Sequence, residues 1–349
     1  MLMAGLLGAC GNDNQQIIGS RDKQIRPVEL VLTEDGRPEP SVLAEIQELH
    51  RDNGDEPQTL DPHRAEGMSS AHILRDLFEG LTSGAPDGRI IPGAAIRWNI
   101  SRDGKTYTFY LRRDALWSNG DPVTAEDFVY GLQRSANPTT ASNFAQALLP
   151  IENAAEVLSG ALPTSELGVS AMDEFTLQIK MRDPTPYFLS LLNHPSTFPV
   201  HRASVLEHGA EFSRPGNLVS NGAYILSDWV IRSRIELVKN EHYWDAENVI
   251  LEKINYYPFV DRGTALKQFR AGKLHWTSSV PSNQYKWLQK HYPGELVTSP
   301  WLASYYFGFN LQREPFIANP DLRLALALVI DRELITEKVT QFGELPSYN

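Results

Sequence analysis

Alternation of apolar and polar side chains is clearest at residues 105–111. Tyr107, Phe109 and Leu111 fall on one face of an extended segment, and the threonines and the tyrosine between them fall on the other. Because aromatic and β-branched residues repeat here with a period of two, the segment is predicted to be a strand with one buried face.

A turn and then a helix are predicted directly after this strand. The run Ser-Asn-Gly-Asp-Pro at residues 118–122 is typical of a turn, because Asn-Gly tolerates positive φ and proline restricts the next φ. Thr124 precedes Asp127 by three residues, a spacing at which the acid completes a helix cap and favours the helix dipole. Phe128 and Leu132 follow four residues apart, so this helix should bury one face.

Apolar residues at helical spacing predict further helices. They are expected at residues 41–50, 69–81, 187–192, 264–271, 285–291 and from 320 onward, and most of residues 141–160 should also be helical. Gly80 and Gly272 stand where a glycine would end a helix. Asn319 should cap the last helix, with Pro320 in its first position, and the apolar stripe within residues 322–329 should be buried.

Runs of β-branched and aromatic residues predict strands in both halves of the chain. They are expected at residues 27–32, in a hairpin within residues 167–181, in one antiparallel sheet from residues 223–226, 234–238 and 250–257, and at residues 305–310. The last strand has no polar alternation, so both of its faces should be covered. Because strands and helices are mixed without strict βαβ alternation, the pattern indicates an α/β or α+β fold with at least two lobes.

Length and charge narrow the class of protein. The chain has 349 residues, 42% of them hydrophobic, which is sufficient for more than one domain-sized core. The net charge of -11 argues against nucleic acid as a partner, because nucleic-acid binders need a basic face. The longest apolar run, residues 324–330, is shorter than the ~18 residues of a membrane span, so we interpret it as a core helix.

The single cysteine, Cys10, lies in an informative setting. Residues 6–9 read Leu-Leu-Gly-Ala, an apolar run that ends in two small residues just before the cysteine. This resembles a bacterial lipobox, in which the cysteine is lipidated and becomes the mature N-terminus, and the polar residues 11–16 fit a tether. The segment before Cys10 lacks the usual Lys or Arg of a signal peptide, and an unused thiol near the terminus is the alternative.

Motifs that would indicate catalysis or cofactor binding are missing from the sequence. No Gly-rich phosphate-binding pattern, no HExxH and no CxxC occurs, and the histidines are scattered, so neither a nucleotide nor a zinc ion is expected. Residues 80–84 place their serine one position too late for a nucleophile elbow. A pair of catalytic carboxylates cannot be identified from sequence alone. The residues therefore favour a binding protein without a cofactor and leave a hydrolase of peptides or glycans as a remote alternative.

Short motifs in a fixed order carry a family resemblance from residue 56 to residue 348. They include LDPH at 60–63, RDLFEGL at 75–81, WSNG at 117–120, PVTA at 122–125, LGV at 167–169, HPST at 194–197, NGAY at 221–224, YW at 243–244 and DR at 331–332. In this order the motifs resemble the periplasmic oligopeptide-binding proteins of ABC importers, within the peptide/nickel-type solute-binding protein family.

The resemblance implies an α/β fold of the two-lobe, type II periplasmic binding protein kind with an extra inserted domain. The chain would divide into a lipoprotein signal and tether at 1–27, the first lobe at 28–78 and 204–270, the smaller inserted domain at 79–203 and the start of the second lobe at 271–349. Family members continue past the match at residues 345–348. The second lobe is therefore expected to be incomplete and the chain to be truncated at its C-terminus.

The function implied by the resemblance is capture of oligopeptides in the periplasm and their delivery to the membrane subunits of an ABC importer, without any reaction. Members of the family hold a peptide by its main chain between two lobes, as in β-augmentation, and accommodate its side chains in hydrated pockets. The protein is expected to be a monomer that touches the membrane only through its lipid anchor. A murein-peptide or dipeptide receptor on the same scaffold is the alternative.

Positions that contact peptide in the family map onto several residues of this chain. They are Glu66, Gly67, Met68, Ser69, Phe144, His194, Ser279, Val280, Asn283 and Arg313. The resemblance places Glu66–Ser69 beside the peptide backbone and Phe144 where many relatives have a cleft-lining tyrosine. Asn283 replaces a glutamate of relatives and should make its pocket less acidic. Arg313 can pair with a peptide carboxylate, and a solvated loop charge is the alternative.

Overall fold

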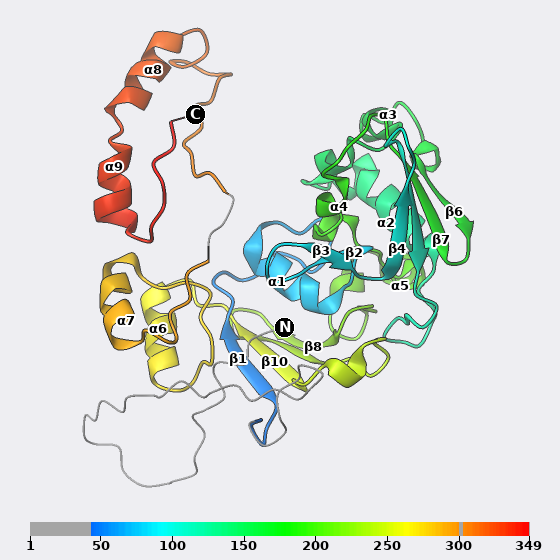
Figure 1. Cartoon of the computed structure of the whole chain (residues 1–349), viewed down its shortest axis with the longest axis horizontal. Helices are drawn as coiled ribbons and strands as arrows, with labels where there is room; N and C mark the ends of the chain where they lie inside the picture. Colours follow the sequence, from blue (N-terminus) through cyan, green and yellow to red (C-terminus); the bar gives the residue numbers. More distant parts are fainter. Residues whose placement is uncertain (1–42, 300–302, 349) are drawn as a thin grey trace. The chain divides into compact units, whose positions relative to one another are not determined.

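Residues 43–299 and 303–348 are described in a computed structural model of the chain (Figure 1). Among them, the residues up to Ser278 form one unit, called unit 1 below, and the residues from Ser279 onward form unit 2. Cys10, the predicted lipidation site, and the strand predicted at residues 27–32 lie outside the described residues.

Four strands of unit 1 form a sheet in the order β1-β10-β9-β8. They are β1 (Glu48–Asp52), β8 (Tyr224–Val230), β9 (Arg234–Lys239) and β10 (Lys253–Tyr257). β8, β9 and β10 pair in antiparallel fashion, whereas β1 runs parallel to β10. The antiparallel sheet predicted within residues 223–257 is therefore confirmed, and the alternation along β9 buries Ile235 and Leu237.

The helix predicted at residues 41–50 is wrong, because strand β1 occupies the end of this segment. Leu49 is buried as a core residue, but Ile46 is 73% exposed, so the apolar spacing does not form one buried stripe. The backbone instead pairs with β10 along the whole of β1. A partner strand far away in the sequence thus overrides the local helical pattern.

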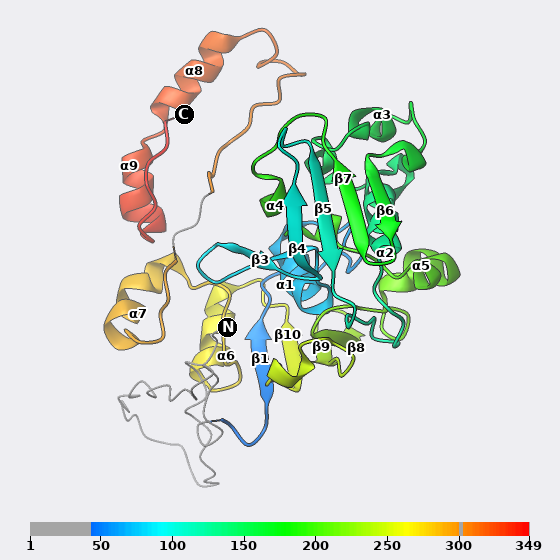
Figure 2. The ribbon, with the colours of Figure 1, turned by 45° about the vertical axis from the view of Figure 1, so that its right-hand side comes forward.

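A second four-stranded sheet of unit 1 has the order β4-β5-β7-β6 (Figure 2). Its strands are β4 (Ala95–Ile100), β5 (Thr106–Leu111), β6 (Val169–Asp173) and β7 (Thr176–Lys180). Helix α2 (Ala125–Ala136) packs against β6 and β7. Tyr107, Phe109 and Leu111 are all buried, and β6 and β7 form a hairpin, so both predictions are confirmed.

Helix α2 begins at the cap that the sequence predicted. Asp127 Oδ2 accepts a hydrogen bond from Thr124 N at 2.8 Å and another from Thr124 Oγ1 at 3.0 Å. Trp117 Nε1 donates to the same carboxylate oxygen at 3.3 Å. The turn before the helix is therefore tied to the first turn of the helix, and Phe128 and Leu132 are fully buried below it.

Helix α1 (Gly67–Leu77) ends earlier than predicted, and Gly80 does not cap it. Phe78 is already extended, with φ of -129°. A Cβ atom at Gly80 would lie 2.8 Å from the ring of Phe198 and 2.9 Å from the carbonyl oxygen of Leu192. The glycine therefore permits close packing of two segments rather than a helix stop.

Shorter elements complete unit 1. They are β2 (Thr82–Gly84), β3 (Ile90–Pro92), η2 (Pro138–Thr140), η3 (Ala145–Leu148), α3 (Ala154–Leu158), η4 (Thr164–Glu166), α4 (Phe188–Leu191), η5 (Pro195–Thr197), α5 (Arg202–His208), η6 (Gly209–Ser213), η7 (Ala246–Asn248) and α6 (Arg262–Arg270). The helices predicted at residues 187–192 and 264–271 are confirmed by α4 and α6. The mostly helical segment predicted at residues 141–160 contains only η3 and α3, separated by non-helical residues.

Unit 2 is built from short helices. They are η8 (Ser282–Gln284), α7 (Tyr285–His291), α8 (Pro320–Val329), α9 (Arg332–Leu334) and the π-helical turn η9 (Ile335–Thr340). Helix α7 matches its prediction, and α8 begins as expected, because the side chain of Asn319 accepts a hydrogen bond from Leu322 N at 3.0 Å.

Two burial predictions for unit 2 are wrong. The apolar stripe of α8 is not buried, since Leu326 is 41% and Val329 81% exposed. Residues 305–310 are not a strand, and Tyr305 is 88% exposed. The physical reason is the same in both cases. An apolar stripe is buried only where another surface faces it, and a strand forms only beside a paired strand. Among the described residues, no sheet contains residues 305–310, and the stripe of α8 stays exposed.

Candidate functional site

The first turn of α1 carries the predicted contact residues Glu66, Gly67, Met68 and Ser69. Glu66 is extended at the N-cap position, with φ of -124° and ψ of 152°, and its side chain makes no capping hydrogen bond. Gly67 has φ of +74°, a conformation that favours glycine whatever the space around it. The first turn contains no acidic residue. Among the described residues, its backbone N–H groups at the positive end of the helix dipole therefore receive no cap from the side chain of Glu66.

Asn53 fixes the start of α1 against the end of β1. Its Nδ2 donates to the carbonyl oxygen of Ser69 at 3.0 Å and to that of Asp55 at 3.2 Å. Asn53 itself is buried, while Gly67 and Met68 are exposed. A buried amide thus holds an exposed turn in place.

The side chains of Phe144 and His194, two predicted contact residues 50 positions apart in the sequence, are in contact. Their ring centroids are 4.4 Å apart and the planes are tilted by 45°. The Nδ1 atom of His194 accepts from the backbone N–H of Ser196 at 3.2 Å. Burial, with a smaller effect of the positive charge of Arg75 on α1, lowers the pKa of His194, so the imidazole is neutral at pH 7. The pair offers a half-open aromatic surface without charge.

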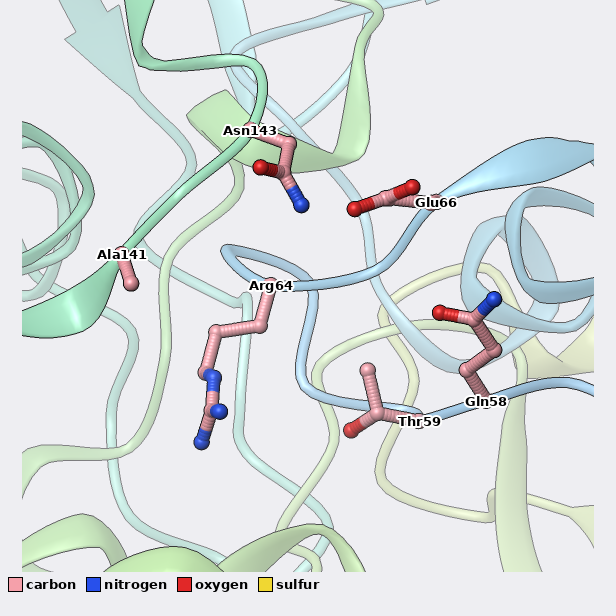
Figure 3. A pocket seen from close by; sticks show the side chains of 6 residues that line it. All are labelled: Gln58, Thr59, Arg64, Glu66, Ala141 and Asn143. Carbon is pink, nitrogen blue, oxygen red and sulfur yellow. The ribbon is translucent and has the colours of Figure 1, made fainter.

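A cavity of about 350 Å³ adjoins the start of α1 (Figure 3). Its walls are formed by Gln58, Thr59, Arg64, Glu66, Ala141 and Asn143. The sequence analysis identified Glu66 but missed the other residues, because no local pattern joins a loop at residues 58–66 to a loop at residues 141–143. The cavity brings Glu66 close to Asn143, the residue before Phe144.

The loop before Glu66 is held to α2 by a buried ionic network. Arg134 donates to both carboxylate oxygens of Asp61, at 2.9 and 2.6 Å, and to His63 Nδ1 at 2.8 Å. The opposite ring nitrogen of His63 donates to the carbonyl oxygen of Phe198 at 2.9 Å. Burial and the charge of Arg134 lower the pKa of His63 to about 4. Burial would raise the pKa of Asp61, but hydrogen bonding to Arg134 and the nearby positive charges lower it.

The last residues of unit 1 contact side chains of β1, which the sequence did not suggest. The guanidinium of Arg51 lies 4.0 Å from the ring centroid of Trp276 and 4.8 Å from that of Tyr256. Asp52 accepts from Ser278 N at 3.1 Å and from Ser278 Oγ at 2.5 Å. Ser278 is therefore anchored, and unit 2 begins at the next residue.

The remaining predicted contact residues belong to unit 2. Ser279 and Val280 are half-buried, whereas Asn283 in η8 and Arg313 are exposed. Within the described residues, the guanidinium of Arg313 has no ion-pair partner, and its backbone N–H donates to Asn310 O at 3.3 Å. The structure thus gathers Glu66–Ser69 with Phe144 and His194 in unit 1 and leaves the other four residues in a separate unit.

The part of the chain that the structure describes offers neither a metal-binding cluster nor a membrane-spanning helix. Residues 43–299 and 303–348 contain no group of three or more His, Cys, Asp or Glu side chains placed to hold a metal ion. None of the helices in the same residues has both the length and the hydropathy that crossing a membrane requires.

Comparison with known proteins gives a consistent set of matches. The sequence profile described as bacterial extracellular solute-binding proteins, family 5 Middle, matches residues 89–349. The periplasmic murein peptide-binding protein MppA of Escherichia coli is 44% identical over 314 residues, covering 89% of this chain and 58% of that protein. The periplasmic oligopeptide-binding protein OppA of the same organism is 43% identical over 309 residues, covering 88% of this chain and 56% of that protein.

Solved structures agree with these matches. OppA of Burkholderia pseudomallei superposes with a TM-score of 0.85 at 38% identity, over 88% of this chain and 60% of that one. Haemophilus influenzae OppA in complex with RPPGFSPFR gives a TM-score of 0.84 at 37% identity, over 87% of this chain and 60% of that one. The chain therefore spans between half and two thirds of the length of the relatives it matches.

Proposed function

Because this chain belongs to family 5 of the bacterial extracellular solute-binding proteins, we propose that it captures oligopeptides and delivers them to an ABC importer. Membership confirms the resemblance in the ordered motifs and the mixed α/β fold that it implied. The relatives are named as binders of oligopeptides and of murein peptides, which supports a peptide as the ligand class here.

The observation that carries the proposal is the uncapped first turn of α1. Among the described residues, the side chain of Glu66 leaves the N–H groups of this turn uncapped, and the backbone at Glu66 is extended. A peptide can supply its carbonyl and N–H groups to them, as an added strand does. Recognition through the main chain suits a protein that accepts many peptide sequences, because every peptide offers the same backbone groups.

Side chains near this turn would shape the rest of the site. Phe144 and the neutral ring of His194 offer a surface for an apolar or aromatic peptide side chain. In unit 2 we propose Ser279, Val280 and Asn283 as further contacts. Arg313 is the proposed partner of a peptide carboxylate, since its guanidinium is exposed and has no ion-pair partner within the described residues.

The proposal extends to the location, the oligomeric state and the domain boundaries of the protein. The E. coli relatives are periplasmic proteins, and we propose the periplasm for this chain, with a lipid anchor at Cys10 and a monomeric state. We retain the lobe and inserted-domain boundaries expected from the family. Capture and release involve no reaction, in keeping with a family of solute-binding proteins.

A murein-peptide receptor is a second candidate, because a murein peptide-binding protein is among the relatives. Identity to the murein peptide-binding MppA is 44%, and identity to OppA of the same organism is 43%, so the two similarities do not separate the ligands. Both candidates need a peptide main chain beside α1, and they differ only in which side chains the neighbouring surfaces accept.

The test is titration of the 349-residue chain with trialanine, followed by the tryptophan fluorescence and by calorimetry. Saturable binding is expected, and Gly67→Ala should weaken it about tenfold, because a side chain at φ of +74° is strained and shifts the exposed N–H groups. The matched control Gly88→Ala has a similar positive φ of +83° in the turn between β2 and β3 and should bind normally.

Two outcomes would reject the proposal. One is the absence of saturable binding by either method. The other is turnover: trialanine recovered after long incubation must be intact, and its hydrolysis at a rate proportional to protein concentration would instead support the hydrolase alternative.

A further inference from the structure

A short connector, residues 275–278, leads from unit 1 into unit 2 and pairs with β1. The N–H of His275 donates to the carbonyl oxygen of His50 at 2.7 Å, and the N–H of Asp52 donates to that of Trp276 at 3.1 Å. β10 pairs with the other edge of β1. The connector therefore extends the sheet by a few residues, and unit 2 begins directly after it.

A histidine side chain adds to this backbone pairing. The N–H of His50 donates to the ring nitrogen Nδ1 of His275 at 3.2 Å. An imidazole nitrogen accepts a hydrogen bond only while it carries no proton, so this contact requires a neutral His275 with its proton on Nε2. Protonation would direct a second N–H group at the N–H of His50 and remove the hydrogen bond.

The ring of His50 lies beside that of His275, with 5.3 Å between the ring centroids. Its Nδ1 is 3.0 Å from the hydroxyl oxygen of Tyr257, and its Nε2 is 3.8 Å from a carboxylate oxygen of Glu48. The side-chain amide of Asn255 donates to the same carboxylate oxygen at 2.6 Å. Glu48 can therefore stabilise a proton on His50, and a positive His50 then opposes a proton on His275.

The other charges of the neighbouring strands are paired with one another. On β9, the carboxylate of Glu236 lies 3.6 Å from the guanidinium of Arg234 and 3.4 Å from the ammonium of Lys253 on β10. Glu236 is thus shared between two cations, whereas Glu48 is the carboxylate in ion-pair distance of His50.

Trp276, the next residue of the connector, contacts a cation and a third histidine. The guanidinium of Arg51 lies 4.0 Å from its ring centroid, and the ring of His72 on α1 meets it edge to face at 6.5 Å. Burial, and then the charges of Arg51 and Arg75, lower the pKa of His72 to about 4. His72 therefore stays neutral in mildly acidic solution, and a change there must come from another group.

We propose that His50 and His275 form a proton-sensitive latch, which holds the connector on β1 while His275 is neutral and loosens it when His275 is protonated. Burial, and then the neighbouring His50, lower the pKa of His275 below its ordinary value of 6.5, and Glu48 opposes this shift. The latch is therefore at full strength above pH 6.5 and weakens as the pH falls below that value.

The consequence of an open latch concerns the start of unit 2. The residues that precede the proposed contacts Ser279 and Val280 are held less firmly when His275 is charged. The latch goes beyond the proposed peptide capture and does not depend on it, because its geometry lies within unit 1.

The first experiment compares amide hydrogen exchange in the 349-residue chain at pH 7.5 and pH 5.5, expressed as protection factors. The amides of His275 and Asp52 should lose protection about tenfold at the lower pH, the factor expected from the loss of one hydrogen bond. The amides of β9 should keep their protection, because His63 and His72 have pKa values of about 4 and stay neutral in this range. An equal loss in β9, or no loss at either connector amide, would overturn the latch.

Two substitutions of His275 separate its proton from its hydrogen bond. In His275→Asn the side-chain oxygen can take the place of Nδ1 as acceptor and does not titrate, so Asp52 should be well protected at both pH values. In His275→Gln the amide reaches toward the position of Nε2 instead, and Asp52 should be poorly protected at both. A loss of about tenfold between the two pH values that persists in His275→Asn would overturn the assignment.

His50→Gln tests the second member of the latch, with His208→Asn as the matched control. Without a positive charge at position 50, His275 binds its proton more readily, so the protection of Asp52 should be lost at a higher pH. His208 is a partly exposed histidine of α5 that lies 4.0 Å from Glu207, and its substitution should leave the midpoint of this loss unchanged. An unchanged midpoint in His50→Gln, or an equal shift in His208→Asn, would overturn the pairing of His50 with His275.

Discussion

Helices α2 and α8 begin with equally clear sequence signals and end in opposite environments. Thr124 and Asp127 close the first turn of α2, and Asn319 closes that of α8, each with hydrogen bonds of about 3 Å. Both helices carry an apolar stripe. In α2 that stripe is fully buried against a sheet, whereas in α8 Val329 is 81% exposed.

The difference shows which property each signal controls. A cap acts within one turn of the chain, so its prediction holds wherever the residues stand. Burial of a stripe requires a second surface, which β6 and β7 supply to α2. Within the described residues, α8 buries none of its side chains, and most of its apolar residues are exposed on a well-formed helix.

The largest expected effect comes from truncating one stripe residue in each helix. Phe128→Ala should lower the free energy of unfolding of unit 1 by about 3 to 5 kcal/mol, because it leaves a cavity in a packed core. Val329→Ala in α8 should change stability by less than about 0.5 kcal/mol. Urea unfolding of both variants, followed by circular dichroism, measures the two values. Comparable losses would mean that the stripe of α8 is buried in solution.

The second-largest effect is expected from lowering the pH, which should destabilise α2 but not α8. The pKa of His63 is about 4 in the folded chain and 6.5 when unperturbed, so the unfolded state binds more protons between these values. The free energy of unfolding should therefore fall as the pH is lowered from 6.5 to 4, by an amount on the order of 3 kcal/mol. His63 binds Arg134 of α2, while α8 contains no histidine, so amide exchange should accelerate in α2 and not in α8.

The variant that isolates this effect is His63→Gln, which should reduce the slope of stability against pH between 6.5 and 4. His72, whose pKa is also lowered to about 4 by burial and by Arg51, acts in the same direction, so part of the slope should remain. An unchanged slope in the variant would show that His63 is not the group responsible.

The smallest effect expected is one that the two helices share. Thr124→Ala and Asn319→Ala each remove a cap and should each cost about 1 kcal/mol of helix stability. Hydrogen exchange of amides in the first turns of α2 and α8 measures both on one scale. A much larger cost in α2 alone would mean that its cap depends on the packing around it, through Trp117 and Asp127, rather than on the cap itself.

The candidate site was predictable only in part. Glu66–Ser69, Phe144 and His194 are positions that the family resemblance identifies, and all of them lie in unit 1. Arg64 and Asn143 were missed because they meet across a cavity and no spacing along the chain relates them. The same holds for Arg51, which lies between two aromatic rings from distant segments.

The amino-acid sequence by itself determined the local elements and the family. The strand at Thr106–Leu111, the cap of α2 and the start of α8 depend on neighbours within a few residues, where side-chain sterics and short hydrogen bonds act. Tertiary structure alone decided that β1 is a strand, that Arg134 joins Asp61 and His63, and that one apolar stripe is buried while another is exposed. Each of these depends on pairing, desolvation or packing between segments far apart in the chain, and local patterns carry no information about such partners.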